Sequence, residues 1–314
     1  MARRGRVFDS RFPAVHAMPP GREVSVRSKD GVRLHVEVFG PDDAPPVVLA
    51  HGITCAIRVW AYQIAELAKD HRVIAYDHRG HGRSGVPRAR HRYSLAHLAG
   101  DLDSVLEATL APGEKALIAG HSMGGIAISS WAEWYPHRVP ERAAAVALVN
   151  TTTGDLLRGV QLLTVPEQFA AARARAAAQA LRAFGGIPLF PGLDRANARL
   201  VSMMAVGPDA DPAIARFVFE LFCQTPPAGR GGWARALVDS IGERYIGVQN
   251  LTVPALVIGA RQDRILPLPS SQRIAEHAPN LADFVQMPGG HCSILEYPDE
   301  VNRHLRALSK TVFC

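Results

Sequence analysis

The string Gly-His-Ser-Met-Gly at 120–124 places a serine between two glycines. Alone it is weak evidence, because about one chain in ten of this composition would contain such a string by chance. Here it follows an apolar strand predicted over 115–119 and opens a helix predicted over 123–135, a strand-turn-helix setting that exposes a nucleophilic serine. The alternative is a nucleotide-binding turn in which Ser122 only caps the helix. Neither phosphate-binding spacing, GxGxxG or GxxxxGK[ST], occurs at this turn, so the pattern favours Ser122 as a nucleophile.

A serine nucleophile requires a histidine that accepts its proton and a carboxylate that orients the histidine. After such a turn the partners follow in the order Ser, acid, His, at the carboxyl ends of later strands. Asp263 follows an apolar strand at 254–259, and His291 follows two glycines and a strand at 283–287. A histidine on a surface loop is the alternative for His291. The order and the strand-end positions predict Asp263 and His291 as the partners of Ser122.

The acid has competing interpretations. Asp263 could be an ordinary loop carboxylate paired with Arg261 or Arg264. An acid could also follow the last strand before residue 151, but Asn150 occupies that position, followed by three threonines. Asp155 lies farther along the chain, so Asp263 is preferred.

Acyl transfer also needs hydrogen-bond donors for the oxyanion, and backbone amides at a loop and a helix start can provide them. The amide of Met123 is one candidate. The second candidate is the amide of Ile53, in the loop His-Gly-Ile-Thr at 51–54 that follows an apolar strand. Alternatively, this loop is only a turn.

The loop 77–84 contains the pair His78 and His81, whose spacing could suggest a metal site. No third ligand follows at helical spacing. We therefore expect a tight turn held by hydrogen bonds of Asp77, Arg79 and Ser84, and we expect neither a metal nor another cofactor.

Strands that alternate with helices must position these residues. Lys-Asp-Gly at 29–31 separates two alternating apolar runs and indicates a hairpin. The predicted strands are 22–28, 32–39, 46–50, 72–76, 115–119, 143–149, 254–259 and 283–287. This alternation predicts an α/β fold with a doubly wound, mostly parallel sheet of about eight strands.

The strand pattern stops between two parts of this core. We expect an irregular leader at 1–21, a core domain at 22–150 and 250–314, and an inserted helical lid at 151–249. Apolar lid residues could shape a substrate pocket or simply pack on the core. The candidate pocket residues are Leu156, Leu157, Leu162, Leu163, Met203, Met204, Phe217 and Phe222.

The chain has 314 residues, 47% of them hydrophobic, and a formal net charge of +6. Its basic residues are scattered rather than clustered, which argues against nucleic-acid binding. The four cysteines are widely spaced, so we expect reduced, buried thiols rather than disulfides or zinc. The leader lacks the apolar region of a signal peptide, and no apolar run reaches the ~20 residues of a transmembrane helix. These features predict a cytoplasmic protein.

Taken together, these motifs resemble the α/β-hydrolase superfamily from about residue 22 to 309. The matching pieces are His51-Gly52, the turn 77–84, the string Gly-His-Ser-Met-Gly-Gly at 120–125, Asp263, and Gly290-His291 with Glu296 and Pro298 beyond. The resemblance implies Ser122 as nucleophile, His291 as base, Asp263 as its orienter, and Ile53 and Met123 as oxyanion donors.

The string around the serine is similar to that of bacterial serine esterases and monoacylglycerol-type lipases. Serine at 122 argues against epoxide hydrolases and haloalkane dehalogenases, which use aspartate there. Ile53-Thr54 stands where some lipases have a longer glycine loop, which disfavours bulky tertiary-alcohol esters.

The resulting hypothesis is a serine hydrolase that cleaves a carboxylic ester of a small to medium apolar acyl group through an acyl-enzyme. The same triad could serve a thioesterase, an amidase, a carbon-carbon bond hydrolase or a cofactor-free haloperoxidase. A ligand-binding protein of the same fold is the non-enzyme alternative. The basic charge and apolar lid leave membrane contact open, and the sequence leaves the oligomeric state open.

Overall fold

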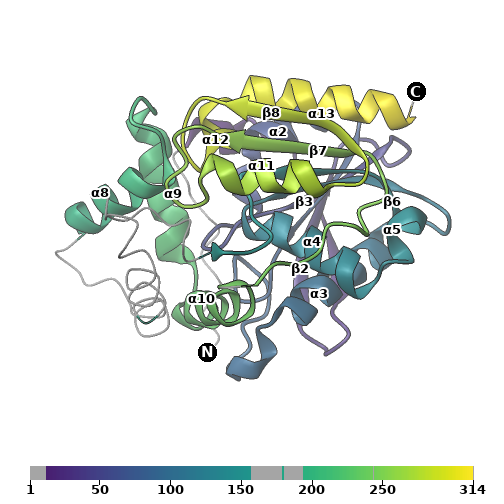
Figure 1. Cartoon of the computed structure of the whole chain (residues 1–314), viewed down its shortest axis with the longest axis horizontal. Helices are drawn as coiled ribbons and strands as arrows, with labels where there is room; N and C mark the ends of the chain where they lie inside the picture. The colour runs from purple at the N-terminus through teal and green to yellow at the C-terminus, as the bar shows by residue number, and fades with distance from the viewer. Residues whose placement is uncertain (1–11, 157–178, 180–193, 243, 314) are drawn as a thin grey trace.

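The computed structural model describes residues 12–156, 179, 194–242 and 244–313 (Figure 1). Eight strands within these ranges are β1 (Arg22–Arg27), β2 (Arg33–Phe39), β3 (Pro46–Ala50), β4 (Arg72–Asp77), β5 (Ala116–His121), β6 (Ala143–Val149), β7 (Ala255–Ala260) and β8 (Leu281–Met287). They form one sheet in the order β1-β2-β4-β3-β5-β6-β7-β8. Only the β1–β2 and β2–β4 pairs are antiparallel. The predicted mostly parallel, eight-stranded sheet is confirmed.

Apolar side chains alternate between the two faces of the sheet, because successive strand residues point to opposite sides. In β3, Val47 and Leu49 belong to one core cluster, and Val48 and Ala50 belong to the other. Helices therefore cover both faces, as a doubly wound fold requires. The first cluster includes residues of α2 (Ala61–Leu67) and α13 (Pro298–Phe313), and the second includes residues of α3 (Leu95–Thr109), α4 (Met123–Trp134), α5 (Arg138–Arg142) and α11 (Leu268–His277).

Between β6 and β7 the chain leaves the sheet and forms the segment 151–249, called the cap below. Its longer described helices are α8 (Asp194–Ala205), α9 (Pro212–Gln224) and α10 (Pro227–Ile241), which lie together at one end of the molecule (Figure 1). Gly154 and Tyr245 form an isolated antiparallel bridge, and the amide of Ile246 donates to the carbonyl of Thr153 at 2.7 Å. The cap therefore starts and ends at one place beside the sheet.

The N-terminal leader is not wholly irregular, contrary to the sequence prediction. Residues Pro13–His16 form the short helix α1, started by a proline whose fixed φ suits the first helical turn. Phe12 is buried and stacks on Phe217 of α9, with ring centroids 4.4 Å apart, and it meets the edge of Tyr62 of α2. This aromatic contact, which the sequence pattern could not reveal, links the leader to both the cap and the core.

The turn that follows β4 is held by the side chains that the sequence indicated. Asp77 accepts hydrogen bonds from the amides of Ile57 (2.9 Å) and Arg83 (2.8 Å). The hydroxyl of Ser84 donates to the carbonyl of Asp77. A side chain at Gly82 would overlap the Asp77 carboxylate, so the turn depends on glycine there.

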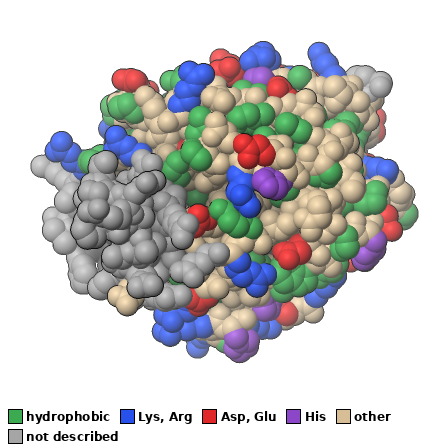
Figure 2. Space-filling view, viewed as in Figure 1, with side chains coloured by type: hydrophobic (Ala, Val, Ile, Leu, Met, Phe, Trp, Pro, Cys, Tyr) green, Lys and Arg blue, Asp and Glu red, His purple; other side chains and the backbone are tan. Residues whose placement is uncertain are grey.

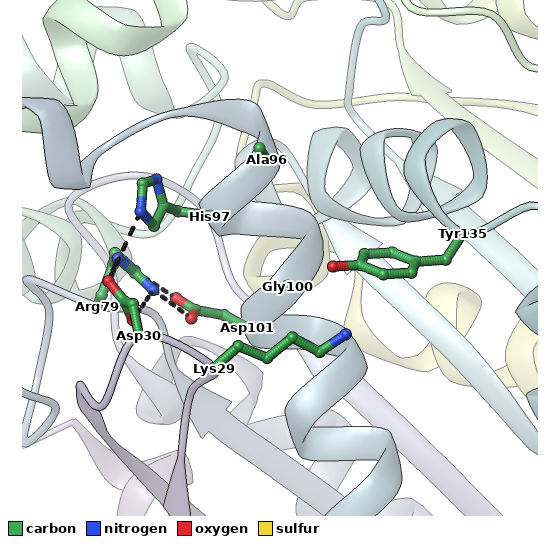
Figure 3. A pocket seen from close by; sticks show the side chains of 8 residues that line it. All are labelled: Lys29, Asp30, Arg79, Ala96, His97, Gly100, Asp101 and Tyr135. Carbon is green, nitrogen blue, oxygen red and sulfur yellow. Dashed lines mark hydrogen bonds and ion pairs between the residues drawn. The ribbon is translucent and has the colours of Figure 1, made fainter.

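Arg79 connects this turn to two other elements. Its buried guanidinium donates to the carboxylates of Asp30 and Asp101 (Figure 3). It also donates to the carbonyl of Arg92, and these five bonds use all five of its N–H groups. Its carbonyl accepts from the indole of Trp233 in α10 at 2.9 Å. Arg79 therefore fixes the turn to α3 on one side and to the cap on the other.

The surface in view in Figure 2 shows lysine and arginine side chains scattered among acidic, hydrophobic and other groups, without a single basic stripe. Among the described helices, none combines the length and apolar content needed to cross a bilayer. Cys55 and Cys292 are buried as expected, whereas Cys223 is exposed.

Candidate active site

Ser122 lies between β5 and α4 with a strained backbone. Its φ of 53° and ψ of −118° place it in a region that costs a side-chain-bearing residue about 1–3 kcal/mol. Two glycines make this geometry possible: a Cβ on Gly124 would lie 2.0 Å from the carbonyl oxygen of Ala50, and one on Gly120 would lie 2.4 Å from the carbonyl carbon of Gly124. The amide of Ser122 donates to the carbonyl of Val149 at 3.0 Å, which fixes the turn to the end of β6.

The side chain of Ser122 has no structural task. It does not cap α4, and its Oγ makes no hydrogen bond within the described part of the chain. The interpretation of Ser122 as a helix cap in a nucleotide-binding turn is therefore excluded. Thr151 secures the backbone instead, because its hydroxyl donates to the carbonyl of Ser122 at 2.7 Å.

Asp263 and His291 meet across the ends of β7 and β8. The ring Nδ1 of His291 lies 2.8 Å from Oδ2 of Asp263. The other carboxylate oxygen of Asp263 accepts from the amides of Ile265 (2.9 Å) and Leu266 (2.8 Å), which fixes the carboxylate in its loop. Arg264 donates to the carbonyl of Met203. The predicted contact is present, and Asp263 is not paired with a neighbouring arginine.

His291 is buried, with 6% of its surface exposed, so it is not the surface-loop histidine of the alternative interpretation. Because an ionised carboxylate only accepts, the hydrogen bond to Asp263 places a proton on Nδ1 of His291. The free Nε2 is then available as an acceptor whenever the ring is neutral.

Asn150 is a further site residue, whose contacts its place in the sequence does not reveal. Its backbone is left-handed (φ 46°), a conformation that asparagine tolerates better than most residues. Its amide nitrogen donates to Asp263 (3.2 Å) and to the carbonyl of Gly290 (3.3 Å), and its amide oxygen accepts from the hydroxyl of Ser293 (2.7 Å). Asn150 therefore joins the acid to the loop that carries His291.

His121 also holds this loop. Its Nε2 donates to the carbonyl of His291 at 2.8 Å, and burial lowers the pKa of His121 to about 3. The ring is therefore neutral at ordinary pH and acts as a fixed donor.

The two candidate oxyanion donors belong to the loop that follows β3 and to the first residue of α4. Within the described residues, the amides of Ile53 and Met123 make no hydrogen bond, so both remain available. A Cβ on Gly52 would lie 3.1 Å from Cβ of Ser122, which shows how close the loop passes to the serine. Thr54 is left-handed (φ 59°). This geometry permits the predicted oxyanion hole, because the loop passes close to the serine at Gly52.

Three buried histidines, His51, His78 and His81, support the loop 51–54. The amide of Thr54 donates to Nε2 of His81 at 3.0 Å, and the amide of His78 donates to Nε2 of His51 at 3.0 Å. Burial lowers the pKa of His51 to about 4 and that of His81 to about 3, so the accepting nitrogens stay unprotonated. Among the described residues, no three His, Cys, Asp or Glu side chains group so as to hold a metal ion. His78 and His81 therefore hold the backbone of the loop 51–54 in place through hydrogen bonds.

The candidate pocket residues differ in their surroundings and in their burial. Leu156 packs, together with Ile53, against the apolar cluster that contains Met123 and part of α10. Phe217 lies in the core against Phe12, so its described contacts are structural. Met204 and Phe222 are half-buried, Met203 is exposed, and Leu157, Leu162 and Leu163 lie outside the described residues.

The chain matches the alpha/beta hydrolase fold family over residues 45–298. It is 31% identical over 276 residues, covering 87% of this chain and 94% of the relative, to the putative carbamate hydrolase RutD of Variovorax paradoxus (strain S110). It is 36% identical over 139 residues to the probable oxidoreductase EphD of Mycobacterium tuberculosis (strain ATCC 25618 / H37Rv). That match covers 44% of this chain and only 22% of the relative's length.

Solved structures show the same fold. The enol-lactonase from Burkholderia xenovorans LB400 has a TM-score of 0.71 at 24% identity, with 91% of this chain and 100% of that chain covered. A thermophilic esterase from Thermogutta terrifontis has a TM-score of 0.71 at 24% identity, with 93% and 100% covered. The family match and the relative matched nearly end to end show that this chain belongs to the α/β-hydrolase family. The resemblance to the α/β-hydrolase superfamily that the motifs indicated is therefore confirmed.

Proposed function

We propose that this protein is a serine hydrolase that cleaves a carboxylic ester of a small to medium apolar acyl group. The observation that carries the proposal is the 2.8 Å contact between His291 and Asp263, which leaves Nε2 of His291 free. His121 binds the carbonyl of His291 at 2.8 Å and directly precedes Ser122, whose backbone is strained and whose hydroxyl has no structural bond. Strained residues of this kind cluster at active sites, and an unused hydroxyl at such a residue supports a catalytic role.

In the proposed mechanism, Ser122 Oγ attacks the ester carbonyl carbon while Nε2 of His291 accepts the hydroxyl proton. Asp263 holds the imidazole in the required tautomer and stabilises the imidazolium that forms. The amides of Ile53 and Met123 donate to the developing oxyanion.

Collapse of the tetrahedral intermediate breaks the bond to the alcohol, which takes the proton from His291. A water molecule then attacks the acyl-enzyme by the same route, with His291 as base, and releases the carboxylic acid and free Ser122. No step needs a cofactor, since every proton passes through His291.

The apolar cluster beside the loop 51–54 supports an apolar acyl group. Ile53, Leu156 and Met123 belong to or pack on this cluster, together with Trp233 and Leu237 of α10. A carbamate is a second candidate, because the relative from Variovorax paradoxus that aligns over 87% of this chain is named a putative carbamate hydrolase. The same attack on a carbonyl carbon applies to both substrate classes.

A substrate panel tests the proposal. It contains p-nitrophenyl esters of graded acyl length, a lactone, a carbamate, a thioester and an anilide, assayed with wild type and Ser122→Ala. We expect the highest kcat/KM on a short or medium acyl ester and a loss of at least about 10³-fold in Ser122→Ala. Full turnover by Ser122→Ala would disprove the serine mechanism, and preference for the carbamate would favour the second candidate.

A further inference from the structure

One carboxylate joins the cap to the loop of His291. Glu296, at the end of the short helix α12 (Ser293–Glu296), accepts a hydrogen bond from the amide of Gly207 at 2.8 Å. It also accepts from the amide of Gly290 at 3.0 and 3.1 Å. Gly207 lies in the cap just after α8, and Gly290 directly precedes His291. The side chain of Glu296 therefore binds two segments that are far apart in the sequence, one at Gly207 and one at Gly290.

The two segments also touch directly. The amide of Cys292 donates to the carbonyl of Ala205 at 2.9 Å. A Cβ on Gly290 would lie 2.4 Å from the amide nitrogen of Gly207, and one on Gly207 would lie 2.9 Å from Glu296 Oε2. We call residues 205–207, residues 289–292 and Glu296 the cap joint. The backbones of residues 205–207 and 289–292 are in direct contact. A shift of residues 205–207 must therefore also move the loop that carries His291.

Other bonds fix the same loop from the sheet side. His121 donates to the carbonyl of His291, and Asn150 donates to the carbonyl of Gly290. These donors belong to the ends of β5 and β6, which are parts of the core. Glu296 supplies the matching restraint from the cap side, so His291 lies between a core anchor and a cap anchor.

Burial disfavours the ionised form of the Glu296 carboxylate. Burial raises the pKa of Glu296, while its bonds from the amides of Gly290 and Gly207 oppose that shift. The carboxylate of Asp263 raises this pKa further, and His291 lowers it. The neighbouring thiol of Cys292 stays neutral, because burial raises its pKa well above the usual value. The cost of desolvating a buried carboxylate offsets the gain from its hydrogen bonds, so Glu296 contributes little to the net stability of the fold. Its bonds to two segments therefore indicate a positioning role.

We propose that Glu296 is a positioning residue that couples the cap to His291, so that the placement of the base depends on the placement of the cap. This inference rests on the proposed role of His291 as the base. It extends that role, since a substrate that shifts residues 205–207 would also shift the imidazole.

The test compares Glu296→Gln with the matched control Glu300→Gln. Glu300 lies in the first turn of α13 and pairs with Arg303 at 3.3 Å on the surface. Glutamine keeps the size of glutamate but replaces one acceptor oxygen with a donor amide. We expect kcat per folded molecule to fall about 10- to 100-fold in Glu296→Gln and to stay unchanged in Glu300→Gln.

Two further readouts separate positioning from a general structural effect. The ratio of wild-type to Glu296→Gln kcat should shrink as pH falls, because a protonated Glu296 loses an acceptor oxygen and resembles glutamine. Hydrogen exchange at 205–210 and at 288–292 should accelerate together in Glu296→Gln, because a single neutral amide oxygen replaces the two charged oxygens that accept from Gly207 and Gly290.

Unchanged kcat per folded molecule in Glu296→Gln, or faster exchange in only one of the two segments, would overturn the coupling. Failure of the proposed function gives a different result. In that case Ser122→Ala would retain turnover, while the exchange experiment would still report whether the joint exists.

Discussion

The imidazole of His121 donates a hydrogen bond to the backbone carbonyl of His291 at 2.8 Å, and the two ring centroids are 4.9 Å apart. Since His121 directly precedes Ser122, this bond ties the end of β5 to the loop of the proposed base. Only the neutral tautomer with a proton on Nε2 and none on Nδ1 is consistent with the lowered pKa of this buried ring.

We expect the protein to lose stability in mild acid, because three of its buried histidines are neutral in the folded state. Burial lowers the pKa of His121 and His81 to about 3 and that of His51 to about 4, whereas in the unfolded chain each is about 6.5. Between about pH 6.5 and pH 4 the unfolded state therefore binds more protons. The free energy of unfolding should be at its full value above about pH 6.5 and fall as the pH decreases through this window.

Urea unfolding followed by tryptophan fluorescence at several pH values measures this dependence. His81→Gln should reduce the slope of the free energy against pH, and replacement of the exposed His277 by glutamine should leave it unchanged. A free energy that is constant from about pH 7 to pH 4.5 would contradict the prediction.

Asp263→Asn should lower kcat by about 10³- to 10⁴-fold while the protein stays folded. An asparagine amide can donate to Nδ1 of His291 and so stabilise the tautomer with its proton on Nε2, which cannot accept from Ser122. Steady-state kinetics on the best ester of the panel measures the loss, with Asp209→Asn at an exposed cap position as control. A loss of less than about 10-fold would remove Asp263 from the proposed mechanism.

Gly124→Ala should destabilise the fold by about 3 kcal/mol or more, because the new Cβ would lie 2.0 Å from the carbonyl oxygen of Ala50. Gly100→Ala in α3 is the control, since its nearest foreign atom would be the hydroxyl of Tyr135 at 3.7 Å. Alanine there should stabilise the helix by about 0.5–1 kcal/mol. Urea midpoints measure both changes, and equal midpoints for the two variants would show that the turn tolerates a side chain.

The sequence predicts the sheet and the placement of Ser122, Asp263 and His291 because these depend on local rules. Apolar runs mark buried strands, and in parallel sheets the strand ends meet at one edge. Asn150 follows one of these strands, and the sequence pattern indicates only that it cannot supply the acid. Its left-handed backbone and its contacts with Asp263 and Gly290, 113 and 140 residues away, become visible only in the folded chain.

The cap illustrates the limit of pattern reasoning. Amphipathic helices show which face is apolar, not what covers it, and Phe217 packs on Phe12 of the leader. The role of Glu296 was equally hidden, since its partners are backbone amides of glycines, and amides leave no side-chain signal in the sequence.

The central claim is that Ser122 becomes acylated during turnover, and trapping the acyl-enzyme tests it most directly. The wild-type protein is mixed with a p-nitrophenyl ester, and the reaction is quenched in acid during the steady state. The protein is then digested, and its peptides are analysed by mass spectrometry. We predict that the peptide containing Ser122 gains the mass of the acyl group, and that Ser122→Ala forms no adduct. Turnover with an unmodified Ser122 peptide under conditions that slow deacylation, or an acyl group on another residue, would contradict the mechanism.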